Sequence, residues 1–377
     1  MRTVKILHLA DIHIGAAESF LSEKAESRRY ETLITFEKIV NLAAENGVQV
    51  IAAAGDIFDS NTVESNFIEG VFNKIAEKSD IKFVFAAGNH DPLDSRSPFL
   101  NRKLPENLYV LSSRDDCKVF DDIGLCVYGR SFDSMFLKGE ERFTLNPERE
   151  DYVNLMVQHG ELKSDLNSDY NAITREFIIN SGMDYIALGH IHKRTEIGKL
   201  GETYFAYSGC PEGQGFDETG EKGVYLGEIG KSTCELEFIP VARRKHIVEK
   251  IDILGIFDSG EIAAKITDTL KEKYGEYYSE NLYKIELIGS IPPETPVTVS
   301  EIQSRLSDKV YYIKIKDSTE PCFDLEALSN VVSLKGIFVK NMLKAIENAD
   351  EDKKAIYKNA LKIGLKAFIG EVGFNED

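Results

Sequence analysis

The sequence lacks paired cysteines. Its five cysteines are an odd number and contain no CxxC spacing, which argues against a zinc cage and against a secreted disulfide framework. This usage of cysteine fits a reducing cytosol. The five are Cys117, Cys126, Cys210, Cys234 and Cys322.

The sequence also has little that resembles a targeting segment. The N-terminal apolar stretch is interrupted by His8 and Asp11, too early for a signal peptide. No later segment is apolar enough to span a membrane, and there is no internal repeat or low-complexity tract. We therefore expect a cytoplasmic protein.

Basic residues are in the minority. Lysine and arginine number 45 against 63 aspartates and glutamates, so the formal charge is 45 − 63 = −18. A chain of this charge repels phosphate backbones as a whole. A stand-alone, tight DNA binder is therefore disfavoured, and a nucleic-acid substrate would need a local basic patch, metals or a partner.

The 377 residues are enough for more than one domain. The apolar runs VKILHLA, VQVIAAAG and KFVFAAG are separated by helical patterns, which predicts a β-α-β-α-β start. A strand-rich part follows, and after VARRKH the pattern restarts as a small α/β unit. We predict a first domain over 1–242, a small α/β cap domain over 243–317 and a helical C-terminal tail over 318–377.

The tail contains apolar stripes at helical spacing. One interpretation is that the stripes pack on the chain's own cap, and the other is that they dock a partner by a helix-in-groove contact. The stripes are Phe338 with Met342 and Ile346, Val339 with Leu343, and Tyr357 with Leu361 and Phe368.

Polar residues follow the apolar strand patterns at several separate places. In α/β sheets, the carboxyl ends of strands are where distant side chains assemble into a site. Carboxylates, imidazoles and amide oxygens together suit a pair of divalent ions. A single Asp or His after a strand is usually a turn residue, but an ordered set favours a metal site. The set is Asp11, His13, Asp56, Asn89, His90, His159, His190 and His192.

The motifs ADIHIG, AGDIFD, AGNHD, QHGE and GHIH resemble, in order and spacing, the calcineurin-like metallophosphoesterase superfamily over roughly residues 1–240. The resemblance implies an α/β protein with a four-layer α-β-β-α sandwich. It implies a first metal bound by Asp11, His13 and His192 and a second metal bound by Asn89, His159 and His190, bridged by Asp56.

In the same family, the histidine that matches His90 protonates the leaving oxygen. A carboxylate at the position of Asp59 orients that histidine. The implied cofactors are two divalent metal ions; manganese suits these ligands well, with iron or zinc as alternatives.

Within the superfamily, the motifs and the segment YSGCPEGQGFDETGEKGVYL resemble the SbcD-type DNA double-strand-break repair exonucleases, with YhaO-like proteins as a close alternative. This implies a manganese-dependent exonuclease, with endonuclease activity also open. DNA would be the substrate and an SbcC-type coiled-coil ATPase the partner, docked on the C-terminal helices. A homodimer is left open.

Several other residues have a plainer interpretation. His8 should face away from Asp11 as a buried structural histidine. His246 is interpreted as exposed linker charge rather than a phosphate contact, and Arg28 and Arg29 either face DNA or cover the following helix. Cys210 has no neighbouring base and is not expected to act as a nucleophile.

Two alternative functions share the metal ligands. The first is a phosphodiesterase or phosphatase that acts on a small or protein-bound phosphate. The second is a non-catalytic scaffold whose metals only hold the fold; the presence of His90 and Asp59 argues against it.

Overall fold

The computed structural model describes residues 2–138, 143–144, 146–147, 149, 151–293, 295 and 297–370. The chain divides into an N-terminal unit, residues 1–247, and a C-terminal unit, residues 248–377. The predicted borders after residues 242 and 317 stay predictions, and the last seven residues of the predicted tail lie outside the described residues. None of the described helices is long and apolar enough to cross a membrane.

The first sheet of the N-terminal unit combines parallel strands with an antiparallel hairpin. The parallel strands β1 to β4 are paired in sequence order, and β13 runs antiparallel to β1. The carboxyl ends of β1, β2 and β3 therefore meet at one edge. In spatial order the strands are β14 (Thr233–Pro240), β13 (Gly223–Gly230), β1 (Thr3–Leu9), β2 (Val50–Ala53), β3 (Lys82–Phe85) and β4 (Leu108–Val110).

The second sheet is also mixed. Strands β6, β7, β10 and β12 are mutually parallel, while β5 and β11 pair antiparallel at the two edges. In spatial order the strands are β11 (Gly198–Leu200), β12 (Thr203–Tyr207), β10 (Tyr185–Gly189), β7 (Val153–His159), β6 (Leu125–Arg130) and β5 (Asp116–Phe120).

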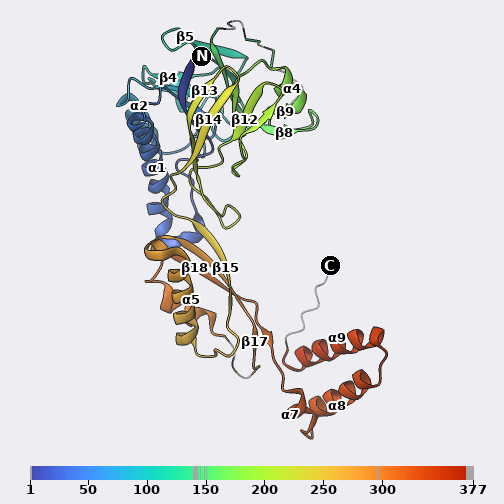
Figure 1. Ribbon diagram of the computed structural model, residues 1–377. Helices are drawn as coiled ribbons and strands as arrows, with labels where there is room; N and C mark the ends of the chain where they lie inside the picture. Colours follow the sequence, from blue (N-terminus) through green and yellow to red (C-terminus); the bar gives the residue numbers. More distant parts are fainter. Residues whose placement is uncertain are drawn as a thin grey trace. The chain divides into compact units, whose positions relative to one another are not determined.

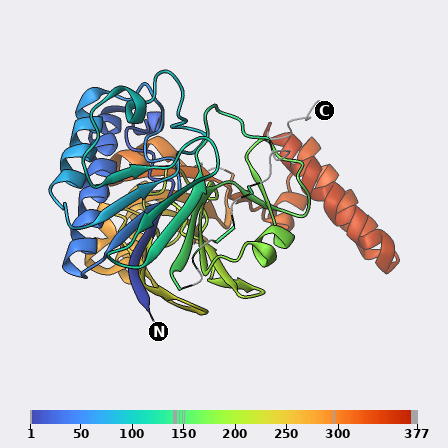
Figure 2. The same ribbon diagram turned by 90° about the horizontal axis from the view of Figure 1, so that it is seen from above.

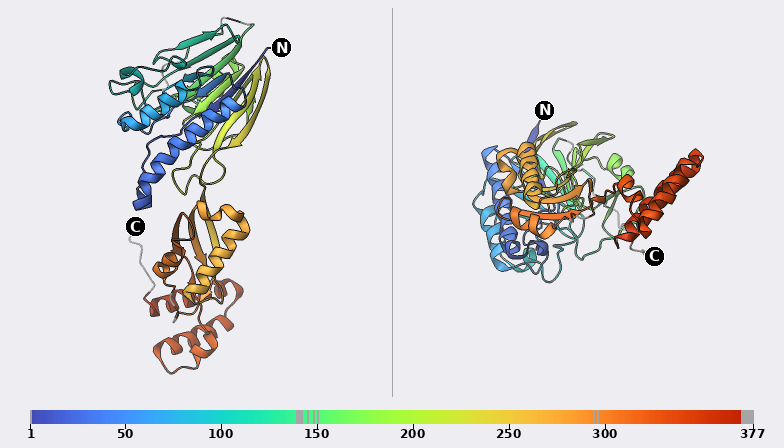
Figure 3. Two further views of the ribbon diagram at one scale, coloured as in Figure 1. Left: turned by 90° about the vertical axis from the view of Figure 1, so that its left-hand side faces the viewer. Right: turned by 90° about the horizontal axis from the view of Figure 1, so that it is seen from below.

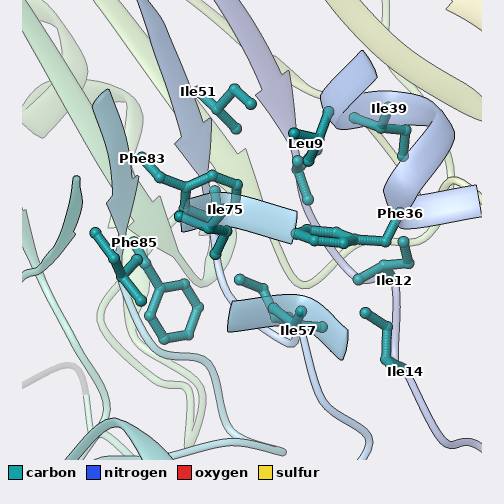
Figure 4. Packing of buried hydrophobic residues seen from close by; sticks show 14 of the residues in the cluster. Leu9, Ile12, Ile14, Phe36, Ile39, Ile51, Ile57, Ile75, Phe83 and Phe85 are labelled. Atoms are coloured by element: carbon teal, nitrogen blue, oxygen red, sulfur yellow. The ribbon is translucent and has the colours of Figure 1, made fainter. Parts of the chain in front are cut away.

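Helices cover the outer face of the first sheet. Helix α1 (Ala25–Glu45) and helix α2 (Ser65–Ala76) lie together on one side of it (Figures 1 and 2). Phe36 and Ile39 of α1 and Ile75 of α2 pack on Ile51 and Phe83 of the sheet (Figure 4). Short helical turns precede α1 and follow β3: η1 (Ser19–Lys24) and α3 (Pro98–Asn101).

The two sheets pack face to face. Val50 and Val84 of the first sheet share a buried cluster with Leu155, Val157 and Ala187 of the second. Because these strands are covered on both faces, they read as continuous apolar runs rather than as alternating patterns.

The outer face of the second sheet has its own core. Ile178 of α4 (Arg175–Asn180) packs there with Met156 and Ile186. The short strands β8 (Glu161–Lys163) and β9 (Ala172–Thr174) form a parallel pair beside it. The layers are therefore helix, sheet, sheet and helix, which confirms the predicted four-layer α-β-β-α sandwich.

The C-terminal unit contains the small α/β part that the sequence predicted. Its sheet has the order β15-β16-β18, with β16 and β18 parallel, and α5 lies over one face (Figure 3). Ile262, Ile266 and Leu270 of α5 are buried. The elements are β15 (His246–Asp252), α5 (Ser259–Tyr274), η2 (Gly275–Glu280), β16 (Leu282–Ile288), β17 (Ser290–Ile291), α6 (Val299–Leu306), β18 (Tyr312–Asp317) and β19 (Glu320–Pro321).

Three helices end the described chain: α7 (Leu325–Ser329), α8 (Leu334–Glu347) and α9 (Glu351–Phe368). Each begins at a polar side chain that accepts from a backbone N–H of the first turn, as is typical of N-caps. Helices α8 and α9 run side by side (Figure 3). Val339 packs with Leu361 and Leu365, so the predicted stripes mainly pack against one another within this helical group.

A buried charge cluster, the Arg28 cluster, lies between α1 and the loop before β13. The Arg28 guanidinium is 1% exposed and donates to Glu18 at 2.7 Å, to Glu31 at 3.0 Å and to Glu212 at 2.9 Å. It also donates to the backbone oxygen of Gly213 at 3.0 Å. Arg28 therefore does not face solvent or DNA but holds distant segments of the unit together.

The prediction that His246 is exposed is wrong. Its side chain is 2% exposed, lies 3.2 Å from Glu18 through Nε2, and packs edge-on against Phe216. The local sequence ARRKH resembles an exposed linker. The His246 side chain is nevertheless buried, in contact with Phe216 and with Glu18, which lies 228 residues earlier in the chain. His8 is buried as expected, with Nδ1 2.9 Å from the Tyr185 hydroxyl.

Candidate metal centre

The polar residues that follow the strands converge on one place. Asp11 and His13 follow β1, and Asp56 follows β2. The loops that carry them are joined by backbone hydrogen bonds, from Asp11 N–H to Gly55 O at 3.0 Å and from His13 N–H to Asp56 O at 3.0 Å. These parallel strands end side by side, so their loops meet as the sequence predicted.

The backbone at the centre is locally strained. Asp11, His13 and Asp56 have φ values of 53°, 47° and 53°, and His190 has a φ of 97°. Left-handed backbone costs about 1–3 kcal/mol for residues other than glycine and persists only where the surroundings impose it. Strain of this kind at four residues from three sequence-distant segments in one place is typical of a functional site.

The first group of donors consists of Asp11, His13 and His192, whose donor atoms all lie within 4.8 Å of one another. The Nε2 atoms of His13 and His192 are 3.1 Å apart. Two imidazoles bound to one ion at about 2.1 Å, in tetrahedral to octahedral geometry, would place their nitrogens about 3.0–3.4 Å apart. The spacing therefore fits a shared divalent ion.

The second group has the same spacing. Asn89 Oδ1 lies 2.9 Å from His159 Nε2 and 3.2 Å from His190 Nδ1. An amide oxygen flanked by two imidazole nitrogens is a suitable donor set for a borderline divalent cation.

Asp56 lies between the two groups. Its Oδ2 is 3.7 Å from His13 Nε2 and 3.4 Å from His159 Nε2, while its Oδ1 accepts from the His90 backbone N–H at 2.9 Å. Burial alone would raise the pKa of Asp56, but the neighbouring histidines, His159 first, hold it below its ordinary value. The carboxylate is therefore kept ionised, as a bridging ligand needs to be.

One histidine of each group is oriented by a hydrogen bond through its second ring nitrogen. A contact of this kind fixes which nitrogen carries the proton and leaves the other lone pair for an ion. Two histidines make such a hydrogen bond: His159 Nδ1 lies 2.8 Å from Ala54 O, and His192 Nδ1 lies against Glu218 Oε1. His13 Nδ1 and His190 Nε2 lie 3.4 Å from the carboxylates of Asp59 and Glu161, which are ion-pair distances rather than hydrogen bonds.

Sequence reasoning missed Glu218 and Glu161. Both oxygens of Glu218 are in use, because Oε2 accepts from the backbone N–H of Gln214 at 2.8 Å and lies 3.5 Å from Cys210 Sγ. Glu218 lies in a loop without periodicity, and its only sequence signal was its place in the segment YSGCPEGQGFDETGEKGVYL. Glu161, by contrast, was visible as the last letter of the QHGE motif.

Asp91 was also missed. It is fully buried and accepts backbone N–H groups from Asp56, Ile57, Phe58 and Gly88 at 2.7–3.2 Å. One carboxylate thus holds together the loops after β2 and β3. Its signal was the Asp that closes the GNHD motif.

Close approach at the centre requires glycine at two positions. A Cβ on Gly88 would lie 2.1 Å from Asp56 Oδ1, and a Cβ on Gly55 would lie 2.3 Å from His159 Nδ1. Real Cβ atoms do not come so near. The glycines of GNHD and AGDIFD therefore make room for the side chains of Asp56 and His159.

His90 lies at the rim, with its side chain 44% exposed. Its Nδ1–H donates to the backbone oxygen of Asp59 at 3.0 Å, and the Asp59 carboxylate is farther away, at 3.8 Å from the same nitrogen. The carboxylate is nearer to His13, at 3.4 Å. A carbonyl can only accept, so Nε2 is the ring atom through which His90 can pass a proton.

Two other predictions concern residues beside the centre. His90, His13 and Asp56 also present donor atoms within 4.8 Å of one another, so geometry alone leaves His90 open as a ligand.

Cys210 is buried, and its burial raises the pKa of the thiol far above its ordinary value. A thiol in that state is a poor nucleophile. The expectation that Cys210 has no neighbouring base is wrong, because the Glu218 carboxylate lies 3.5 Å from its sulfur.

Comparison with known proteins agrees with this chemistry. The model of the calcineurin-like phosphoesterase family matches residues 4–194. The uncharacterized metallophosphoesterase YhaO of Bacillus subtilis is 29% identical over 342 residues, 83% of this chain and 81% of that protein.

Archaeal relatives are more distant. The DNA double-strand break repair protein Mre11 of Sulfolobus acidocaldarius is 24% identical over 365 residues, 94% of this chain and 90% of that protein. Mre11 of Methanopyrus kandleri is 26% identical over 272 residues, 65% of this chain and 59% of that protein. The family match covers half of the chain and includes the motifs that build the centre. The chain therefore belongs to the calcineurin-like phosphoesterase family and is a metal-dependent phosphoesterase.

Proposed function

We propose that the protein is a manganese-dependent DNA nuclease of the SbcD type that acts in DNA repair, as an exonuclease and in part as an endonuclease. The observation that carries the proposal is the arrangement of two donor groups about Asp56. Relatives named as double-strand break repair proteins support DNA as the substrate, one of them over 94% of this chain.

In this proposal each donor group holds one ion. Asp11, His13 and His192 would hold the first ion, and Asn89, His159 and His190 would hold the second, with Asp56 available to both. When bound, such ions supply an activated water and neutralise charge on the phosphoryl oxygens. The protein itself then needs no nucleophilic side chain.

His90 is the proposed general acid. The Asp59 carbonyl holds its Nδ1–H at 3.0 Å and so aims the ring. Nε2 then donates a proton to the departing sugar oxygen, which prevents an alkoxide from leaving unprotonated. The exposure of His90 at the rim agrees with a residue that meets the substrate.

The test offers purified protein with manganese three substrates: linear duplex DNA, single-stranded DNA and an aryl phosphodiester. The nuclease proposal expects degradation of DNA, abolished in Asp56→Asn. Hydrolysis of the aryl substrate without cleavage of DNA would instead support a small-phosphodiester enzyme or phosphatase, and hydrolysis of neither would support a metal-bound scaffold. Repeating the assay with iron and zinc tests the preference for manganese.

The partner in this proposal is an SbcC-type ATPase that binds the helices α8 and α9. Three isoleucines remain exposed after the stripes have packed on each other: Ile337 at 55%, Ile356 at 64% and Ile363 at 51%. Large exposed apolar side chains on neighbouring helices suit a helix-in-groove contact.

Docking is tested in the full chain. Ile356→Asp combined with Ile363→Asp should abolish pull-down of the ATPase and leave hydrolysis of the aryl phosphodiester intact. The control is Leu100→Asp, at a side chain of similar exposure, 58%, in the N-terminal unit. Retained pull-down by the double variant would contradict the docking proposal.

A further inference from the structure

A row of rings extends outward from the metal centre. The ring of Tyr170 stacks on that of His190, with centroids 4.9 Å apart and planes at 28°. Phe136 lies against Tyr170 with its centroid 5.8 Å away. We name Tyr170 and Phe136 the aromatic ledge, which begins at a candidate ligand and ends at the surface.

Backbone hydrogen bonds fix the ledge to the centre. Leu137 N–H donates to Asp169 O at 2.8 Å, and Asn171 N–H donates to Leu137 O at 2.6 Å, which joins the segments of Phe136 and Tyr170. The Asn171 side chain then donates to His159 O at 2.7 Å. The ledge is thus held in register with a candidate ligand of the second ion.

A series of hydrogen bonds through side chains also fixes the position of Tyr170. The Tyr170 N–H donates to Ser168 Oγ at 2.9 Å, and that hydroxyl donates to Glu161 Oε2 at 2.9 Å. Glu161 in turn lies 3.4 Å from His190 Nε2. The position of Tyr170 therefore depends on the same carboxylate that pairs with His190.

The outer part of the ledge is open. Phe136 is 50% exposed and its neighbour Met135 is 60% exposed. Single exposed apolar residues are common and usually without function. Here the exposed ring of Phe136 contacts Tyr170, which stacks on His190 of the metal centre. Backbone hydrogen bonds hold the segment of Phe136 in place, so its ring can serve as a binding surface.

We propose that the aromatic ledge stacks the nucleobase next to the scissile phosphate, with Phe136 as the main contact. The inference rests on the proposed nuclease function. Stacking accepts any base and is worth about 1–3 kcal/mol per base. It suits a chain with a net charge of −18, which cannot rely on general attraction to phosphates.

The proposal also names a substrate class. A base inside a duplex is already stacked on its neighbours, and unstacking it costs free energy. Bases at single strands and frayed ends reach the ledge at less cost. The protein should therefore prefer single-stranded or frayed ends over intact duplex.

The test compares two single-stranded oligonucleotides that differ only in whether the terminal nucleotide carries a base. With manganese, the unaltered protein should cleave the base-bearing substrate with a kcat/KM about 5- to 150-fold higher, mainly through KM, the ratio that corresponds to one stacked base. Phe136→Ala should bring the ratio near one, and Phe136→Tyr should keep it. The control is Tyr30→Ala, an aromatic of α1 with 42% exposure, which should keep the full ratio.

Binding gives a readout without turnover. In a His90→Gln background, 2-aminopurine at the terminal position should be quenched on binding, and Phe136→Ala should remove the quenching. An unchanged cleavage ratio in Phe136→Ala, or an equal loss on both oligonucleotides, would overturn the ledge proposal. Cleavage of neither oligonucleotide, with the aryl phosphodiester still hydrolysed, would overturn the nuclease function and the ledge together.

Discussion

Replacing Arg28 with methionine should destabilise the N-terminal unit strongly, although Arg28 is not a proposed ligand. Methionine keeps much of the apolar stem but removes the guanidinium, which makes four hydrogen bonds in the Arg28 cluster. The carboxylates of Glu18, Glu31 and Glu212 are 6%, 4% and 1% exposed. In the variant these three carboxylates would remain buried, with one positive charge fewer beside them.

The expected loss in the free energy of unfolding follows from the burial of Arg28 and its three carboxylate partners. Breaking a buried ion pair by removing one partner costs about 3–5 kcal/mol, because a charge is left uncompensated. For a unit of this size, 1 kcal/mol lowers the melting temperature by about 2–4 °C, so calorimetry should show a decrease of about 6–20 °C. The control is Arg96→Met, whose side chain is 68% exposed and pairs with Asp94 at 2.9 Å. An exposed pair is worth about 0–1 kcal/mol, so the control should shift by at most about 4 °C.

A double variant tests the reason for the loss. If stranded charge is the cause, adding Glu212→Gln to Arg28→Met should recover part of the stability, because a neutral amide is less costly to bury than an unpaired carboxylate. Equal shifts in Arg28→Met and Arg96→Met, or a further loss in the double variant, would refute the reasoning.

Three predictions concern the metal centre. Asp56→Asn should lose bound metal and abolish hydrolysis, because an amide cannot bridge two cations as a carboxylate does; two ions per chain with normal turnover would show that Asp56 is not the bridge. His90→Gln should keep its metal content while turnover falls about 10²–10⁴-fold, whereas His159→Gln should lose metal; equal metal loss in both would make His90 a ligand. Glu218→Gln should weaken metal affinity about 10- to 100-fold, because the carboxylate orients His192; unchanged metal binding in a titration would leave Glu218 without that role.

The candidate site could be predicted from sequence as far as it follows strand ends. Asp11, Asp56 and Asn89 each follow an apolar strand, and parallel strands bring such positions together. Glu218 lies in a segment that the sequence marked, but its contact with His192 could not be predicted, because the loop has no periodicity and the contact is set by the tertiary fold.

The same limit explains the errors of interpretation. Arg28 and His246 resembled surface charge because each has a partner that is distant in sequence: Glu212 is 184 residues from Arg28, and Glu18 is 228 residues from His246. The tail stripes were correctly seen as helical faces. Their periodicity could not show that α8 and α9 would use those faces mainly against each other.

The donor groups contain residues from both sheets of the N-terminal unit. Asp11 and Asp56 follow strands of the first sheet, and His159 is the last residue of a strand of the second sheet. Any ion that these residues hold jointly is released when the sheets separate, so metal occupancy and folding are thermodynamically linked. At a free ion concentration 100 times the dissociation constant, this linkage adds about 2.7 kcal/mol to the free energy of unfolding. If these residues hold an ion, the resistance of the N-terminal unit to heat would depend on the metal supply of its surroundings, and a chelator would lower its melting temperature.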